Sequence, residues 1–209
     1  MTSAAEAPDR PPRPVLPPLH SDIHNKSILD LRLNLWLGRG VEVLSVEPAR
    51  RQFTNMIRLM DKTVIEYESA KDRCADWLRG LDGSGMPHLA AYYRAIDHME
   101  NCIGALHRTL LHLERIRQTP AASPVDRIGH KALRAAIGEI NDMRDAIEHA
   151  DERLLTVEKG APLPVPALRS DRMTVGPDSV AYVDLAQWIY QTFRLVRMLL
   201  DEAPKGKTP

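Results

Sequence analysis

The sequence predicts a mainly α protein, an up-and-down bundle of four long helices with a small β-hairpin or short-sheet appendage. Three observations support this fold class. Four long segments repeat large apolar residues at spacings of three and four, short connections join the first three of them, and shorter segments alternate with a period of two. The chain has 209 residues, enough for a substantial core, and its 28 basic residues balance its 28 acidic ones. We therefore expect no overall field that steers the protein to nucleic acid or membrane.

Both ends of the chain are predicted to lie outside the bundle. Residues 1–20 hold six prolines and only three large aliphatic residues, so we predict a disordered, proline-rich tail that cannot offset the entropy cost of ordering. Residues 204–209 are predicted to form a short frayed tail. The segment between them, residues 21–203, is predicted to be a single helical-bundle domain.

A leucine-rich segment precedes the first long helix. Leucine alternates with other residues from Ile28 to Leu37, and Val41 and Val43 continue the alternation after a glycine-containing turn. A period of two around such a turn predicts a β-hairpin over residues 28–46. Because leucine is also a strong helix former, a leucine-rich helix is the alternative.

The first two long helices have the clearest apolar stripes. The first is predicted from about Glu47 to Leu81, and the second from Pro87 to just before Pro120. The first stripe consists of Phe53, Ile57, Met60, Val64, Tyr67, Cys74, Leu78 and Leu81. The second consists of Leu89, Tyr92, Ile96, Met99, Ile103, Leu106, Leu110 and Leu113. We expect Ile96, Met99, Ile103 and Leu106 to be fully buried, because no polar residue interrupts this stripe.

Two more helices flank an irregular segment. The third helix is predicted to be capped by Ser123 and to turn a row of aliphatic residues inward, and the fourth is predicted to begin near Ser179. The third row consists of Ile128, Leu133, Ile137, Ile140, Ile147 and Leu154. Residues 160–177 contain four prolines and two glycines, which excludes a helix. Within them Met173 to Val175 are predicted to form a strand that pairs with the 28–46 hairpin.

Several classes of site are excluded by the residues present. Cys74 and Cys102 lie on different predicted helices without metal-ligand spacing, which argues against a disulfide scaffold and a zinc ribbon. No histidine follows a glutamate by three residues, as di-iron bundles require, and no glycine-rich loop continues into Lys-Ser/Thr. We therefore predict no metal and no cofactor. No apolar run is long enough to cross a membrane, so a cytoplasmic protein without membrane contact is expected.

The segment from Asn141 to Arg153 is the strongest candidate for chemistry. On a helical wheel Arg144 lies about 40° from Ile140 and Asp151 about 20° from it, so both belong to the predicted inward face. A buried guanidinium must be paired, and Asp151 is a candidate partner, as is a carboxylate of another helix such as Asp61 or Glu66. In a purely structural interpretation, Arg144 forms a salt bridge and the acidic row around His149 is a solvated helix face.

The residues Arg144-Asp145-x-x-x-His149 resemble the R-x(4–6)-H motif of the HEPN (higher-eukaryote and prokaryote nucleotide-binding) superfamily. The resemblance implies a homodimeric helical bundle that is either a metal-independent endoribonuclease or a nucleotide-binding member of a toxin–antitoxin or defence system. RNA, a nucleotide or an antitoxin would be its partner. By the same resemblance, the catalytic residues would be Arg144 at the phosphate, His149 as general acid or base, and Asp145 as its orienting group.

Arg144 and His149 lie about 140° apart on a helix, so one copy cannot easily bring them together. A two-fold dimer with facing third helices could place both pairs in one cleft. The alternative function is that of a non-catalytic helical-bundle association module, a protein–protein interaction partner. That alternative predicts a flat apolar patch instead of a cleft beside Arg144.

Overall fold

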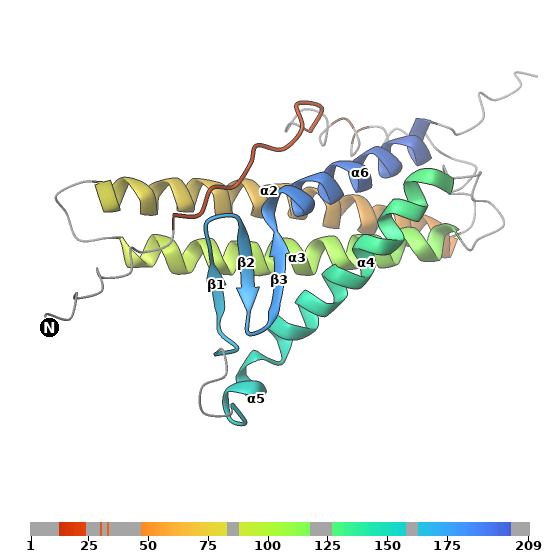
Figure 1. Ribbon diagram of the computed structural model, residues 1–209. Coiled ribbons are helices and arrows are strands. Elements are labelled where there is room, and N and C mark those ends of the chain that lie inside the picture. Colours follow the sequence, from red (N-terminus) through yellow and green to blue (C-terminus); the bar gives the residue numbers. More distant parts are fainter. Residues whose placement is uncertain are drawn as a thin grey trace, which may run out of the picture.

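The computed structural model describes residues 13–23, Asp30, Leu33 and the ranges 47–82, 88–117, 127–157 and 163–201. The predicted fold class is confirmed: long helices pack together and carry a small antiparallel sheet (Figure 1). The helices are α2 (Glu47–Asp82), α3 (Leu89–Arg117), α4 (Arg127–Glu148), α5 (Ala150–Leu154) and α6 (Tyr182–Asp201). The strands are β1 (Pro166–Leu168), β2 (Arg172–Val175) and β3 (Asp178–Ala181).

The antiparallel pair of α2 and α3 is the longest and closest helix contact in the molecule (Figure 1). Their predicted stripes meet between them, and the expected burial of Ile96, Met99, Ile103 and Leu106 is confirmed. The buried stripe of α3 begins later than predicted, since Leu89 in the first turn is 53% exposed. Burial of this long, mainly apolar seam makes the pair the scaffold for the rest of the fold.

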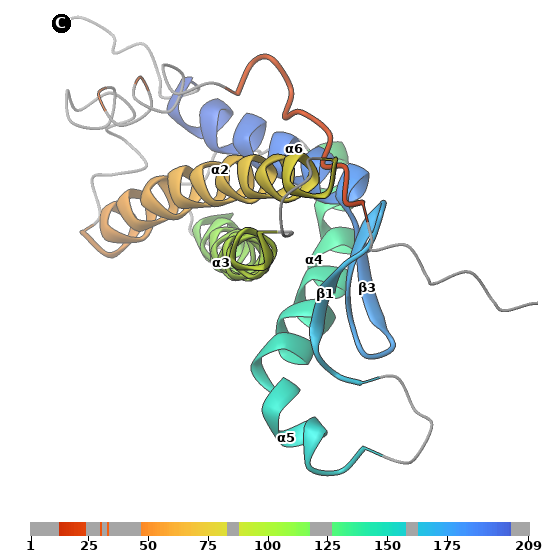
Figure 2. The same ribbon diagram turned by 90° about the vertical axis from the view of Figure 1, so that its left-hand side faces the viewer.

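α4 leaves the α2–α3 pair at an angle and runs along the sheet toward α5 (Figure 2). Its buried face differs from the predicted one, since Ile137 and Ile147 are only half-buried and Leu154 is exposed. The buried residues are Leu133, Ala136, Ile140, Met143 and Ala146. The small alanines allow close approach on one side of the helix, so the buried face is rotated away from the row of large aliphatic residues.

The sheet has the order β1-β2-β3, with β2 in the middle. The strand predicted at Met173 to Val175 is confirmed, but its predicted pairing with residues 28–46 is wrong because β1 and β3 occupy both edges of β2. Gly176 turns the chain between β2 and β3 with a positive φ of 60°, a conformation that favours glycine. The predicted helix start near Ser179 is also wrong: Ser179 belongs to β3, and α6 begins at Tyr182.

The N-terminal segment packs on the bundle over residues 13–23, so the expected tail is wrong for residues 13–20. Leu16, Leu19 and Ile23 are buried, and the Tyr67 hydroxyl donates a 2.8 Å hydrogen bond to the carbonyl of Pro17. The prolines lower the entropy that the chain loses on ordering, which makes burial of few aliphatic side chains sufficient. Residues 1–12 and 204–209 lie outside the described residues.

The predicted 28–46 hairpin lies mostly outside the described residues. Asp30 and Leu33 are described, and both are helical, as the alternative of a leucine-rich helix predicts. Among the helices of the described ranges, none combines the length and the apolar character needed to cross a membrane.

Candidate functional site

Arg144 lies on the flank of α4, held by carboxylates of its own helix. Its Nε donates a 2.8 Å hydrogen bond to Oε1 of Glu148, Nη2 donates to the other oxygen of the same carboxylate, and Nη1 lies 3.1 Å from Oδ1 of Asp145. The Arg144 side chain is 33% exposed. Three of the five guanidinium N–H groups can be engaged in this way, so the carboxylates fix its orientation and leave donors toward solvent.

This geometry corrects the predicted environment of Arg144. The arginine is neither fully buried nor paired with Asp151, Asp61 or Glu66, because its partners Asp145 and Glu148 both follow it on α4. Arg144 lies about a quarter of a turn from the middle of the alanine-lined buried face, which places it at the edge of the interface. Asp151 is exposed on α5, beyond the break that ends α4.

His149 occupies that break. Its backbone has φ −103° and ψ 13°, and its side chain makes no capping hydrogen bond to α5. The ring is 55% exposed, and its Nδ1 lies 3.1 Å from Oε2 of Glu152. Asp145, which was predicted to orient His149, instead contacts Arg144 and accepts a 3.2 Å hydrogen bond from Asn141. The structure therefore joins Arg144 to Asp145 but not to His149.

A salt bridge joins α5, the short helix that follows His149, to the sheet. Arg153 of α5 lies 3.1 Å from the Asp178 carboxylate, at the start of β3. α5 is thus tied to the sheet one turn after His149. The anchor limits the directions in which the exposed imidazole can reach.

His107 of α3 is the histidine that faces Arg144, and sequence reasoning missed it. It is only 6% exposed and hydrogen bonds to the side chain of Asn141. Burial and the nearby Arg144 guanidinium lower its pKa, against the opposite influence of Asp145 and Glu148. A buried imidazole with a lowered pKa thus lies within the electrostatic influence of Arg144. The available signal was the position of His107 beside Leu106, within the buried stripe of α3.

The C-terminal end of α4, with Arg144 and His149, is called the α4 end below. It offers an exposed imidazole and an oriented guanidinium, which are groups suited to proton transfer and to phosphate contact. Within the described residues, no group of three or more histidine, cysteine or acidic side chains is arranged to hold a metal ion. Comparison of the chain with protein-family models, with curated proteins and with solved structures found no match.

Proposed function

We propose that this chain is a HEPN-like protein that acts as a metal-independent endoribonuclease when two copies bring their α4 ends together. The observation that carries the proposal is that Arg144 and His149 both reach solvent at one end of the molecule. Within one chain, however, the two side chains have separate partners and do not pair with each other. Each copy thus offers one proton-transfer group and one phosphate-binding group at the same exposed end. A second copy supplies the complementary set.

The chemistry needs two proton transfers and one charge-stabilising contact. His149 of one copy removes the proton from a 2′-hydroxyl, the 2′-oxygen attacks phosphorus, and the bond from phosphorus to the 5′-oxygen breaks. His149 of the second copy gives its proton to the departing 5′-oxygen, so the products are a 2′,3′-cyclic phosphate and a 5′-hydroxyl. Arg144 contacts the phosphate oxygens on which negative charge builds.

The carboxylates around Arg144 have a defined part in this proposal. The clamp formed by Glu148 and Asp145 holds the guanidinium plane in one orientation before RNA arrives. Such preorganisation avoids the cost of ordering a long side chain in the transition state. It also lowers the positive charge at the site, so strong binding of the RNA strand must come from elsewhere on the surface.

The proposal is tested by incubating labelled single-stranded RNA with the protein in the presence of EDTA. The wild type should generate cyclic-phosphate ends, and His149→Ala should lower the cleavage rate by about 10²–10⁴-fold, the usual contribution of a general acid or base. His88→Ala is the matched control, because His88 is an exposed histidine at the start of α3. A wild type without cleavage, or equal cleavage by His149→Ala, would contradict the proposal.

A second candidate function is association between copies of this chain without catalysis. It is favoured by large apolar side chains exposed between α5 and β1, where Leu155 is 89%, Leu163 63% and Val165 45% exposed. Scattered apolar residues are common, but a group of them marks an interaction surface. This candidate predicts that Leu155→Asp abolishes self-association in light scattering, while RNA stays intact with every variant.

A further inference from the structure

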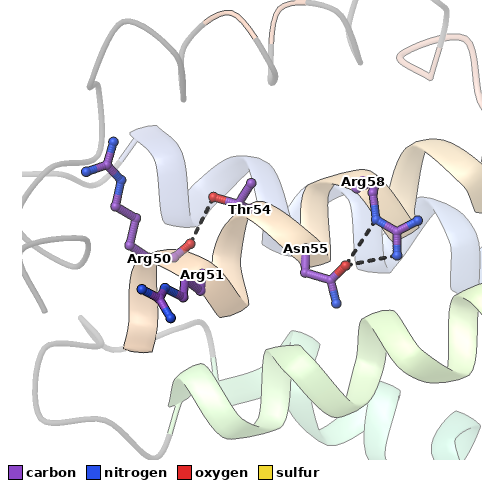
Figure 3. Close-up of a pocket in the computed structure, with 5 residues that line it drawn as sticks. All are labelled: Arg50, Arg51, Thr54, Asn55 and Arg58. Carbon is purple, nitrogen blue, oxygen red and sulfur yellow. Dashed lines mark hydrogen bonds between the residues drawn. The ribbon is translucent and has the colours of Figure 1, made fainter. Parts of the chain in front are cut away.

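A pocket of about 370 Å³ lies along the first turns of α2, apart from the α4 end (Figure 3). Arg50, Arg51, Thr54, Asn55 and Arg58 line it. None of the lining residues that the structure describes carries a carboxylate. The volume falls in the range of small-molecule sites, and three guanidinium groups at one opening are far more cationic than the neutral chain as a whole.

Arg58, an exposed arginine that lines the pocket, is bound to a neutral group. Nε and Nη2 of Arg58 donate hydrogen bonds of 3.1 and 2.9 Å to the amide oxygen of Asn55 (Figure 3). The amide oxygen of Asn55 is therefore an acceptor, and its nitrogen, 2.8 Å from Nε2 of His112, is the donor. The relay from Arg58 through Asn55 to His112 contains no negative charge.

His112 is the neutral end of this relay, and the positive potential around it comes from the neighbouring arginines. Because its Nε2 accepts from Asn55, Nδ1 carries the hydrogen, and this buried atom has no partner among the described residues. Burial and the guanidinium groups of Arg115 and Arg58 lower the pKa of His112, so the ring is neutral near pH 7. Two arginines thus act on one site from α2 and α3, with only neutral groups in the relay between them.

Phosphate oxygens are the ligands that this arrangement fits. Guanidinium groups bind phosphate through paired N–H donors, and the positive end of the α2 dipole adds to the attraction at Arg50 and Arg51. Figure 3 shows the Arg50, Arg51 and Arg58 side chains spread along one helix, so that successive anionic groups could be held. An apolar or cationic ligand would leave the charge of Arg58, whose described partner is a neutral amide, without compensation.

We propose that this pocket binds the phosphate groups of a nucleotide or of a single-stranded RNA. The inference rests on the proposed function in that RNA is taken as a carrier of the phosphate, but it uses different residues. The pocket holds the strand in the ground state, and the α4 end performs the chemistry. The pocket thus supplies the electrostatic attraction for RNA that Arg144, compensated by its carboxylate partners, does not supply.

The test is binding at low ionic strength, measured with inorganic pyrophosphate, with ADP and with a labelled single-stranded oligoribonucleotide. Arg58→Gln should weaken binding at least about tenfold, as expected for loss of one charge-assisted contact. With the oligoribonucleotide it should also reduce the slope of log K against log salt by about 0.7. Arg94→Gln, an exposed arginine near the opposite end of the α2–α3 pair, is the matched control and should change neither quantity.

The outcomes separate this inference from the proposed nuclease function. Binding that depends on Arg58 supports the pocket, and the probe that binds identifies a nucleotide or an RNA strand as the source of the phosphate. Absence of binding to all three probes, or equal weakening by Arg94→Gln and Arg58→Gln, overturns the inference. His149→Ala should bind as the wild type does, so a protein that binds through Arg58 but never cleaves RNA overturns only the nuclease.

Discussion

Two histidines of α3 have similar contacts to different helices but differ in the charges that surround them. His112 contacts Asn55 of α2, and the amide of Asn55 also binds Arg58. His107 hydrogen bonds to Asn141 of α4, beside Arg144. Burial lowers the pKa of both histidines, and an arginine lowers it further in both.

The difference lies in what the arginine meets. Arg58 binds a neutral amide, whereas Arg144 binds the carboxylates of Glu148 and Asp145. A guanidinium with a neutral partner keeps its full charge for an incoming anion, and one between two carboxylates is oriented but largely compensated. The charges next to an arginine, more than its sequence motif, therefore determine whether its positive charge remains available to a ligand.

The largest effect is expected from removing the more buried histidine. His107→Ala should lower the free energy of unfolding by about 3 kcal/mol, because it leaves a cavity and deprives Asn141 of a partner in the interior. His112→Ala should cost about 1 kcal/mol, since its ring is only partly buried. Urea unfolding of both variants measures the difference. Equal losses would show that the two contacts are energetically the same.

Asn55→Asp should convert the α2 cluster into an analogue of the α4 cluster. The new carboxylate would compensate Arg58, as Asp145 and Glu148 compensate Arg144, and phosphate affinity should fall about tenfold. Asn141→Asp is the matched change on α4 and should leave phosphate binding unaltered. Pyrophosphate titration of the two variants tests the assignment. Unchanged affinity in Asn55→Asp would mean that the pocket does not attract anions by its charge.

Removing the clamped arginine should have a modest effect on stability. Arg144 and its carboxylate partners are one-third to one-half exposed, so Arg144→Ala should lower the free energy of unfolding by about 1 kcal/mol or less. A fully buried, uncompensated charge would instead predict about 3–5 kcal/mol. Thermal or urea unfolding separates these values. The larger loss would indicate that the α4 end is more deeply packed than the exposed fractions imply.

The smallest effect is a dependence of stability on pH. The pKa values of His107 and His112 in the folded protein lie below the ordinary value of 6.5. Below that pH the unfolded chain takes up protons that the folded protein resists, so their contribution to stability is complete above it and is lost as the pH falls. Unfolding at pH 7.5 and 5.0 should therefore show a smaller loss in the double variant His107→Gln/His112→Gln than in the wild type. An equal loss would exclude these histidines as the cause.

The fold was predictable where a long apolar stripe has a single partner. α2 begins at the predicted Glu47 and ends one residue beyond the predicted Leu81, and the seam with α3 is buried as expected. The face of α4 was not predictable from its large residues, because Ala136 and Ala146 determine how closely it packs. The start of α6 was misplaced because a strand directly precedes Tyr182, without a loop to mark the change in period.

The candidate site was predictable only in part for a related reason. A wheel drawn on one helix placed Arg144 on the inward stripe, whereas its actual partners depend on the rotation of α4. His107 and Arg58 belong to contacts between helices that are distant in sequence, so no local motif contains them. The spacing of Arg144 and His149 did predict correctly that the two side chains would not meet within one chain.

The central claim, that two copies together form the nuclease site, is tested most directly by mixing the wild type with His149→Ala. When equal amounts are unfolded and refolded together, about a quarter of the dimers are wild type and about half are mixed. A mixed dimer keeps one His149, whereas the proposed reaction needs one histidine as base and a second as acid. The mixture should therefore retain roughly a quarter of the activity of the same total amount of wild-type protein. Circular dichroism and light scattering of each protein alone would confirm that both fold and dimerise. Retention of one half of the activity, from two folded and dimeric proteins, would contradict a site shared between copies.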